Sequence, residues 1–278
     1  MQDHVAQNDS SKAGIEDNPV IIQKDGAVAT LTLNRPPARN ALSLPMIAAV
    51  TSAVSEVSED REISAVILAA NGPGFCAGHD LKEMTARRRD DDRGRAFFEE
   101  TMHACSNMMQ SIVRSPKPFI AAVHGIATAA GCQLVATCDL AVASTEAKFA
   151  TPGVNIGLFC STPMIALSRN VSRKHAMEML LLGDILSAED ANANGLVNRV
   201  SSPENLMNEA RGLADQIASK SPLTVAIGKE AFYKQLEMPL AEAYDYAAGV
   251  MVKNMMARDA EEGIGAFIEK RNPVWTGE

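Results

Sequence analysis

The sequence lacks the features that mark several large classes of protein. No apolar run reaches the length of about 20 residues that a membrane-spanning helix needs. Lys and Arg number 26 against 34 Asp and Glu, a net charge of -8, so there is no excess of cations for the phosphates of nucleic acid. The five cysteines show no zinc-type spacing. The composition therefore predicts no membrane span, no nucleic-acid partner and no metal site.

The first residues also lack recognisable targeting signals. Residues 1–17 are polar and slightly acidic, without the apolar core of a secretory signal or the arginines of a transit peptide. We interpret them as a mobile tail outside the fold. An odd number of cysteines in a long chain is typical of reduced thiols, so we expect a cytoplasmic protein in which most cysteines are small buried residues.

Apolar residues are abundant, at 46%, which is enough for one large core. Residues 19–34 predict two strands joined by a Lys-Asp-Gly turn, residues 34–43 a loop kept irregular by two prolines, and residues 44–60 an amphipathic helix. A buried strand, a glycine-rich turn and a helix then occur twice in succession. This order predicts an α/β fold of repeated ββα units with parallel strands, followed from about residue 203 by helices only.

The segment HGIATAAGCQLVATCDLAVA, residues 124–143, begins like a loop and ends like a strand. Up to Cys132 it has almost no side chain larger than a methyl group. Such residues let one backbone approach another backbone, or a ligand, very closely. Gln133 then places an uncharged amide at the end of the small-residue run.

Two glycine-rich turns each follow a strand and open a helix. The first contains Gly72, Gly74 and Gly78, which is one residue too long for a dinucleotide fingerprint, so a nicotinamide-dependent oxidoreductase is poorly supported. Instead, the turns bring the backbone N–H groups of His79 and Ala130 to helix starts, where two converging donors form an oxyanion hole for a polarised carbonyl. Two tight turns without a site explain the pattern equally well.

Several segments carry a resemblance to a known family, namely FCAGHDLKEM, KPFIAAVHGIATAAGCQLVATCDLAVAS, KFATPGVNIGL, AMEMLLLGDILSAEDANANGLVNRV and EEGIGAFIEKR. In matching order over residues 19–275, they resemble the enoyl-CoA hydratase/isomerase (crotonase) superfamily. The segments GLFCSTP and KRNPVW are most similar to its enoyl-CoA hydratase domain-containing subgroup. The resemblance implies a crotonase-type spiral core over residues 18–202 and a helical trimerisation region over residues 203–278. It also implies a homotrimer or a dimer of trimers.

The resemblance further implies an acyl-CoA thioester as substrate or ligand, with no bound cofactor. The N–H groups of His79 and Ala130 would bind the thioester carbonyl. The positions that it assigns to substrate or CoA binding are Arg39, Ala77, His79, Asp80, Leu81, Lys82, Gly131, Phe267 and Lys270. Of these, Arg39 and Ala77 would lie near the adenosine end, and Phe267 and Lys270 would reach the CoA of a neighbouring subunit.

The sequence departs from the family at the two glutamates that handle water and the α-proton. Their positions are occupied by Gln133 and Gly153, neither of which can titrate. General acid–base catalysis needs a group whose pKa lies near the working pH. We therefore expect an oxyanion hole without the standard hydration pair, and very weak hydration.

Four other groups are candidate substitutes for the missing pair. The imidazole of His79 could point into the pocket, although a role for its backbone N–H is favoured. Asp80 better fits a helix-capping carboxylate. Cys160 and Ser161 lie where other family members place an additional acid, but Ser161 or Thr162 as a helix cap is favoured there. His124 is expected to brace the second turn.

The leading hypothesis is an enoyl-CoA hydratase/isomerase-like enzyme of fatty acyl-CoA metabolism. Isomerisation, decarboxylation and thioester hydrolysis all remain open as its reaction. The alternative is a non-catalytic acyl-CoA-binding or scaffold protein on the same fold.

Overall fold

The computed structural model describes residues 18–278, so the expected tail of residues 1–17 lies outside the described residues. The main sheet has six strands in the order β1 (Val20–Asp25), β2 (Val28–Leu33), β3 (Ala65–Ala70), β5 (Phe119–Val123), β7 (Leu140–Ser144) and β10 (Arg199–Ser201). β1 and β2 form the predicted antiparallel hairpin, and the other neighbouring strands pair in parallel. The predicted α/β class with parallel strands is confirmed.

A second, smaller sheet has four strands in the order β4 (Gly74–Cys76), β6 (Ile126–Thr128), β8 (Lys148–Ala150) and β9 (Leu186–Ser187). β4, β6 and β8 each follow a main-sheet strand, so they supply the second strand of each predicted ββα unit. The repeat of ββα units was predicted from the sequence, but the residues of β6 were expected to form a loop. A strand of three residues is too short for the alternating pattern by which strands are recognised.

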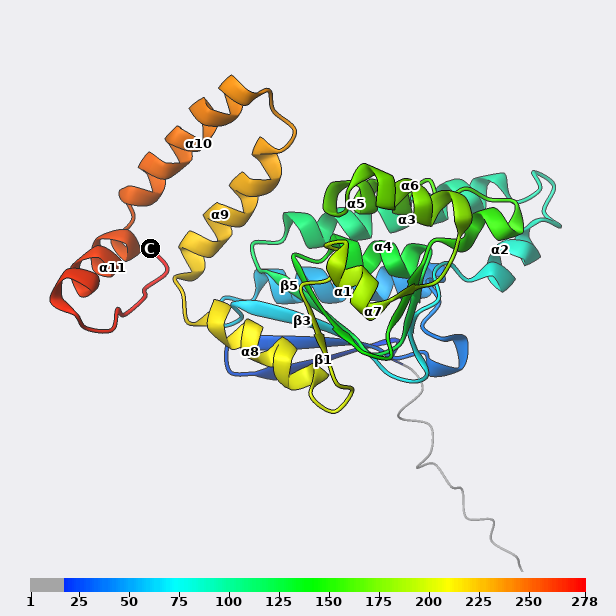
Figure 1. Cartoon of the computed structure of the whole chain (residues 1–278), viewed down its shortest axis with the longest axis horizontal. Coiled ribbons are helices and arrows are strands. Elements are labelled where there is room, and N and C mark those ends of the chain that lie inside the picture. Colours follow the sequence, from blue (N-terminus) through cyan, green and yellow to red (C-terminus); the bar gives the residue numbers. More distant parts are fainter. Residues whose placement is uncertain (1–17) are drawn as a thin grey trace, which may run out of the picture.

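Side chains alternate between two cores on the opposite faces of the main sheet. On one face, Ala65, Ile67 and Ala69 of β3 pack against α8 (Leu206–Ala218). On the other face lies the larger core, which contains Val66 and Leu68 of β3. The helices α1 (Leu44–Glu59), α3 (Arg95–Arg114) and α4 (Ala130–Thr137) cover this second face (Figure 1).

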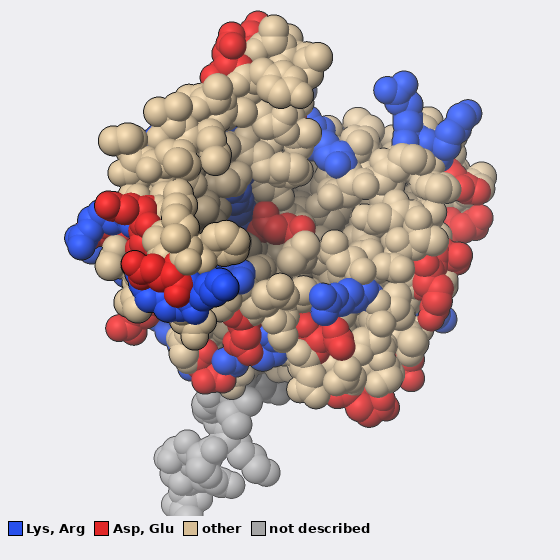
Figure 2. All heavy atoms as spheres, turned by 60° about the vertical axis from the view of Figure 1, so that its left-hand side comes forward, with Lys and Arg blue, Asp and Glu red and all other residues tan. Residues whose placement is uncertain are grey.

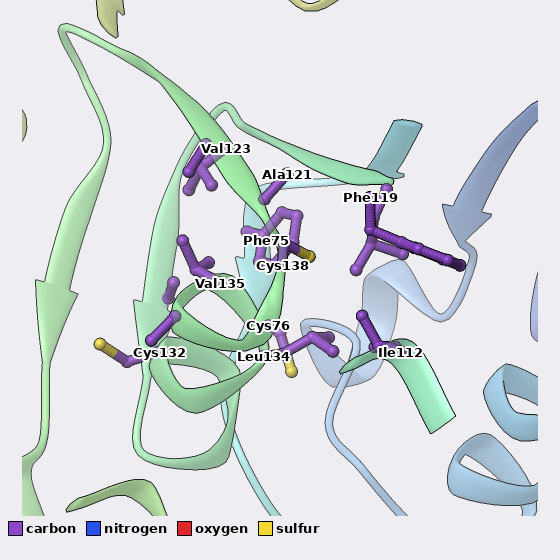
Figure 3. Packing of buried hydrophobic residues seen from close by; sticks show 14 of the residues in the cluster. Phe75, Cys76, Ile112, Phe119, Ala121, Val123, Cys132, Leu134, Val135 and Cys138 are labelled. Carbon is purple, nitrogen blue, oxygen red and sulfur yellow. The ribbon is translucent and has the colours of Figure 1, made fainter. Parts of the chain in front are cut away.

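α4 lies at the centre of the larger core. All eight of its residues are buried, although it is one of the shorter helices. Leu134, Val135 and Cys138 surround Phe75 and Ala121 from the neighbouring strands (Figure 3). Because every residue of this helix is enclosed, the position of α4 is closely fixed by packing.

The remaining short elements of the body are η1 (Pro36–Ala38), α2 (Leu81–Arg87), η2 (Pro152–Ile156), α5 (Pro163–Asn170), α6 (Arg173–Leu182) and α7 (Ala188–Ala193). The loop expected over residues 34–43 thus contains one turn of 3-10 helix. Pro36 begins this turn, because the fixed φ of proline suits the first helical position.

Three helices extend from the body as a C-terminal arm, residues 222–278: α9 (Pro222–Gln235), α10 (Leu240–Met255) and α11 (Arg258–Glu269) (Figure 1). No residue of α9 or α10 is buried. No helix within residues 18–278 combines the length and the apolar character needed to cross a membrane.

A buried ion pair attaches the arm to the body. Lys229 of α9 lies 2.7 Å from the Asp139 carboxylate and donates to the carbonyl oxygens of Ile112 and Lys117 at 3.0 and 2.8 Å. The Tyr233 hydroxyl donates to the same carboxylate at 2.9 Å. The Lys229 side chain is only 6% exposed, so removing either partner would leave an uncompensated buried charge. The start of the arm is therefore fixed to the sheet.

The end of the chain folds back onto the arm. The Asp259 carboxylate, on a residue that is 2% exposed, accepts hydrogen bonds from Ser221, Thr276 and Gly277. The Trp275 indole N–H donates to the Ser219 carbonyl at 2.9 Å. These bonds join the last residues to the junction between α8 and α9.

Candidate functional site

The two glycine-rich turns lie in direct backbone contact. β4 and β6 pair in parallel just before the chain reaches the starts of α2 and α4. A Cβ built on Gly78 would lie 2.9 Å from the Thr128 carbonyl oxygen and 3.3 Å from the Ala130 nitrogen. The two turns that precede His79 and Ala130 therefore lie side by side in the fold.

Gly131 explains the run of small residues. A Cβ at this position would lie 2.1 Å from the carbonyl oxygen of Cys76, far inside the contact distance of real atoms. The small side chains thus allow the first turn of α4 to lie against β4. The backbone of β4, at Cys76, is therefore what lies so close to the small residues of α4.

Ala129 has an unusual backbone conformation between β6 and α4. Its φ of 50° and ψ of -117° are values that glycine adopts more readily. Its N–H donates to the Ala150 carbonyl at 2.9 Å, which holds it in place. A strained residue of this kind costs about 1–3 kcal/mol and is found most often at functional sites. Here the conformation sets the direction of the peptide that carries the Ala130 N–H.

The N–H of His79 points away from the neighbouring chain segment. Leu42 accepts a hydrogen bond from the Asp80 N–H and donates one to the Gly78 carbonyl. His79 lies between Gly78 and Asp80. In an extended chain its N–H therefore points to the side opposite Leu42. Ala130 is the first residue of α4, so its N–H has no acceptor within the helix. Within residues 18–278, neither N–H has a protein acceptor.

Gln133 is nearly enclosed at 5% exposure, and its Oε1 has no hydrogen-bond partner. Gly153, the other position of the missing pair, is the second residue of η2 (Pro152–Ile156) and is also buried. A Cβ there would lie 2.7 Å from the Leu158 carbonyl oxygen and 2.9 Å from the Cys160 Sγ. Gly153 is not among the residues with positive φ. The obstacle to a side chain at 153 is therefore occupied space, not backbone strain.

The thiols near the site are protonated. All five cysteines are free and buried. Burial raises the pKa of Cys132 to about 12 and also raises the pKa of Cys160. A thiol of this kind is a poor nucleophile because only the thiolate attacks.

Most of the other expected binding residues surround the first turn. The Arg39 carbonyl accepts the Ala77 N–H at 3.0 Å, so these two residues are adjacent. Asp80 caps α2, because its carboxylate accepts the N–H groups of Lys82 and Glu83. Leu81 and Lys82 are exposed on the first turn of that helix. The favoured interpretation of Asp80 as a cap is confirmed.

Two expectations for neighbouring residues had different outcomes. The Ser161 hydroxyl donates to the Phe159 carbonyl and does not cap α5. Thr162 occupies the expected N-cap position before Pro163, but its side chain makes no capping bond. Pro163 at the helix start leaves one fewer N–H to satisfy. His124 does brace the turns, since its Nε2 donates to the Gly72 carbonyl at 2.8 Å.

Phe267 and Lys270 lie on the C-terminal arm, in α11 and directly after it, away from the two turns. The Phe267 residue is 83% exposed and contributes nothing to the core of its own chain. Seen from the side of the arm, the surface is hollowed, with acidic side chains inside the hollow (Figure 2). The fold does not bring these two residues to the site of the same chain.

Sequence reasoning missed Asn40, which holds the first turn in place. It is fully buried, and its amide donates to the carbonyls of Asn71, Gly74 and Phe75 at 2.9–3.2 Å. Its Oδ1 accepts the Arg35 N–H. Its φ of 54° is one that asparagine tolerates better than most residues, which was the available signal.

Comparisons with known proteins agree with the geometry. A family profile described as enoyl-CoA hydratase/isomerase matches residues 23–278. The mitochondrial enoyl-CoA hydratase domain-containing protein 3 of Rattus norvegicus is 47% identical over 267 residues, covering 95% of this chain and 87% of the relative. A probable enoyl-CoA hydratase of Rhizobium meliloti is 34% identical, over 91% of this chain and 95% of the relative.

Solved structures give the same result. An enoyl-CoA hydratase of Mycobacterium smegmatis superposes with a TM-score of 0.88 at 51% identity, over 92% of this chain and 98% of that one. The human enoyl-CoA hydratase domain-containing protein 3 superposes with a TM-score of 0.88 at 45% identity, over 92% of this chain and 100% of that one. Several of the sequence relatives are mitochondrial by name, so the cytoplasmic location expected above stays a prediction.

The contact at Gly131 predicts a large loss of stability in Gly131→Ala. The added methyl group must displace α4 from β4, and overpacking of this kind costs about 1–3 kcal/mol. Urea unfolding measures the change. The control is Gly212→Ala in α8, where a Cβ meets nothing within 4 Å, and there the helix should gain about 0.5–1 kcal/mol. Equal urea concentrations at the unfolding midpoint for the two variants would contradict the close contact between Gly131 and Cys76.

Proposed function

The chain belongs to the enoyl-CoA hydratase/isomerase family, and from this premise we propose that it binds acyl-CoA thioesters. The thioester carbonyl would lie between the N–H groups of His79 and Ala130. The observation that carries this proposal is the pair of N–H groups without protein acceptors, on two turns in backbone contact. One such donor typically contributes about 3 kcal/mol to the stability of a developing oxyanion.

The site favours a neutral ligand group with a polarised oxygen. Ala130 begins α4, so the positive end of the helix dipole adds to its N–H. The adjacent Arg39 and Ala77 would lie near the adenosine end of CoA, with Leu81 and Lys82 along the channel. No step of this proposal requires a metal or a bound cofactor.

We propose that the reaction depends on stabilising an enolate or an oxyanion, as isomerisation, decarboxylation and thioester hydrolysis all do. Hydration is disfavoured because Gln133 and Gly153 cannot move protons. The alternative, a non-catalytic acyl-CoA-binding protein on the same fold, is favoured by one observation. The space for a side chain at Gly153 is taken by Leu158 and Cys160.

The C-terminal arm supports assembly into a trimer or a dimer of trimers. Its exposed apolar side chains include those of Leu240, Tyr244, Val252, Met256, Phe267 and Ile268, which are 64–83% exposed. Monomeric proteins rarely expose so large an apolar surface. In such an assembly, Phe267 and Lys270 would reach a neighbouring subunit. The division of the chain at residue 202 stays a prediction, since α8 packs on the sheet and the arm begins only at α9.

The oxyanion-hole proposal predicts the behaviour of Ala130→Pro. Proline at the first position of a helix removes one N–H donor, but it follows Ala129, whose ψ of -117° proline disfavours, so circular dichroism first establishes that the variant is folded. We expect butyryl-CoA affinity to fall about fivefold to tenfold by calorimetry. The control is Arg173→Pro at the start of α6, after a residue with ψ of 150°, where affinity should not change. Unchanged affinity in folded Ala130→Pro would refute the proposal.

The missing glutamates predict very slow hydration of crotonyl-CoA by the natural chain. Gln133→Glu with Gly153→Glu restores both carboxylates, but Cys160 and Leu158 obstruct the second one. Adding Cys160→Ala should therefore raise hydration above that of the double variant, within the range of about 10²–10⁴-fold that one proton-transfer group contributes. Cys160→Ala alone is the control and should gain nothing. Turnover by the natural chain at the rate of an active hydratase would show that other residues supply the acid and the base.

The exposed arm predicts a particle of three or six chains, each of 29.6 kDa, in light scattering at micromolar concentration. Placing two lysines in the apolar surface, by Val252→Lys with Met256→Lys, should lower the measured mass. Lys253→Gln, on an exposed residue of the same helix, should leave it unchanged. A stable monomer of the natural chain would exclude the proposed assembly.

A further inference from the structure

Unpaired polar atoms are concentrated at one place in the molecule. Within residues 18–278, four buried side-chain atoms have no hydrogen bond of good geometry: both ring nitrogens of His79, Oε1 of Gln133 and Oγ1 of Thr151. Gln133 is 5% exposed and Thr151 is fully buried. An unsatisfied buried polar atom costs about 1–3 kcal/mol. A cluster of such atoms is expected where a ligand or an ordered water supplies the missing partners.

These three residues lie on segments that meet at Ala129. His79 follows Gly78, whose added Cβ would lie 3.0 Å from the Ala129 Cβ. The Gln133 N–H donates to the Ala129 carbonyl at 3.0 Å, one helical turn away. Thr151 follows Ala150, whose carbonyl accepts the Ala129 N–H. The three residues thus belong to segments that lie next to the start of α4, where the Ala130 N–H is.

Only one of these groups can move a proton near neutral pH. An amide and a hydroxyl do not titrate there. Burial lowers the pKa of His79, and a weak hydrogen bond of the ring with the Leu42 backbone offsets part of this effect; in the neutral ring one nitrogen carries a lone pair. Histidine is the side chain most often used for general acid–base catalysis.

The charged groups around His79 are already engaged. The Asp80 carboxylate caps α2 and lies 3.6 Å from the Arg35 guanidinium. Glu83 accepts the Leu44 N–H. On the side of α4 and η2 the titratable groups are the protonated thiols of Cys132 and Cys160. No carboxylate of these segments is left to act as a base.

We propose that the His79 imidazole is the proton-transfer group of this site. Its unprotonated nitrogen takes a proton from the α-carbon of the bound thioester. The electrons of that C–H bond form the enolate, whose negative oxygen is held by the N–H groups of His79 and Ala130. The imidazolium returns a proton to the α-carbon in the reverse step. This inference rests on the proposed function, because it requires a bound acyl-CoA.

Exchange of the α-protons of butyryl-CoA in deuterated water tests this role directly. Butyryl-CoA cannot be hydrated, and proton NMR follows the loss of its α-signal. His79→Gln keeps the backbone N–H but not the base, so exchange should fall about 10²–10⁴-fold. Butyryl-CoA affinity, measured by calorimetry, should stay within a few-fold of the natural value. Added imidazole should restore exchange in His79→Ala.

The pH profile provides a second readout. The neutral ring is the reactive form, so exchange should rise with pH and level off below the ordinary histidine pKa of about 6.5. His103→Gln, on an exposed residue of α3, is the control and should exchange at the natural rate. Binding without exchange, or full exchange in His79→Gln, would overturn the role of His79 but leave the proposed function intact. No binding of butyryl-CoA by the natural chain would overturn both.

Discussion

The contact between Gly131 and the Cys76 carbonyl is the constraint on which the site depends. A Cβ would need to lie 2.1 Å from that oxygen, so the first turn of α4 reaches β4 only through a glycine. The rest of α4 is enclosed by the main core and cannot move independently (Figure 3). The two N–H groups are therefore held by packing of the whole domain. Donors fixed before the reaction need no reorganisation when charge develops.

Burial gives the enclosed side chains of the site a second common property, which is that none of them is charged. It raises the pKa of the thiols at Cys132 and Cys160 and lowers the pKa of His79, and the residue at 133 is an amide. Negative charge that develops on a ligand would thus meet backbone dipoles and a neutral ring. In surroundings of low polarity such dipoles act more strongly than they would in water.

The strand and helix order, the paired turns and the cap at Asp80 could be predicted because they depend on local patterns that the sequence displays. The small sheet could not, since strands of two or three residues carry no period. The role of Asn40 was also hidden, because its three acceptors lie more than thirty residues away along the chain. At Gly153 the sequence revealed the missing carboxylate. Only the structure revealed that Leu158 and Cys160 fill its space.

Functional groups of the main chain and of side chains differ in how easily an amino-acid substitution removes them. The N–H donors belong to the backbone, so almost any residue at positions 79 and 130 preserves them while the turns stay in contact. An acid–base pair belongs to side chains and disappears with two substitutions. In this chain the Cys160 thiol and the Leu158 carbonyl occupy the space beside Gly153, so a single substitution to glutamate does not fit there. A fold in which two turns meet through backbone contacts keeps that arrangement while the side chains around it change, which is how one scaffold comes to serve different reactions.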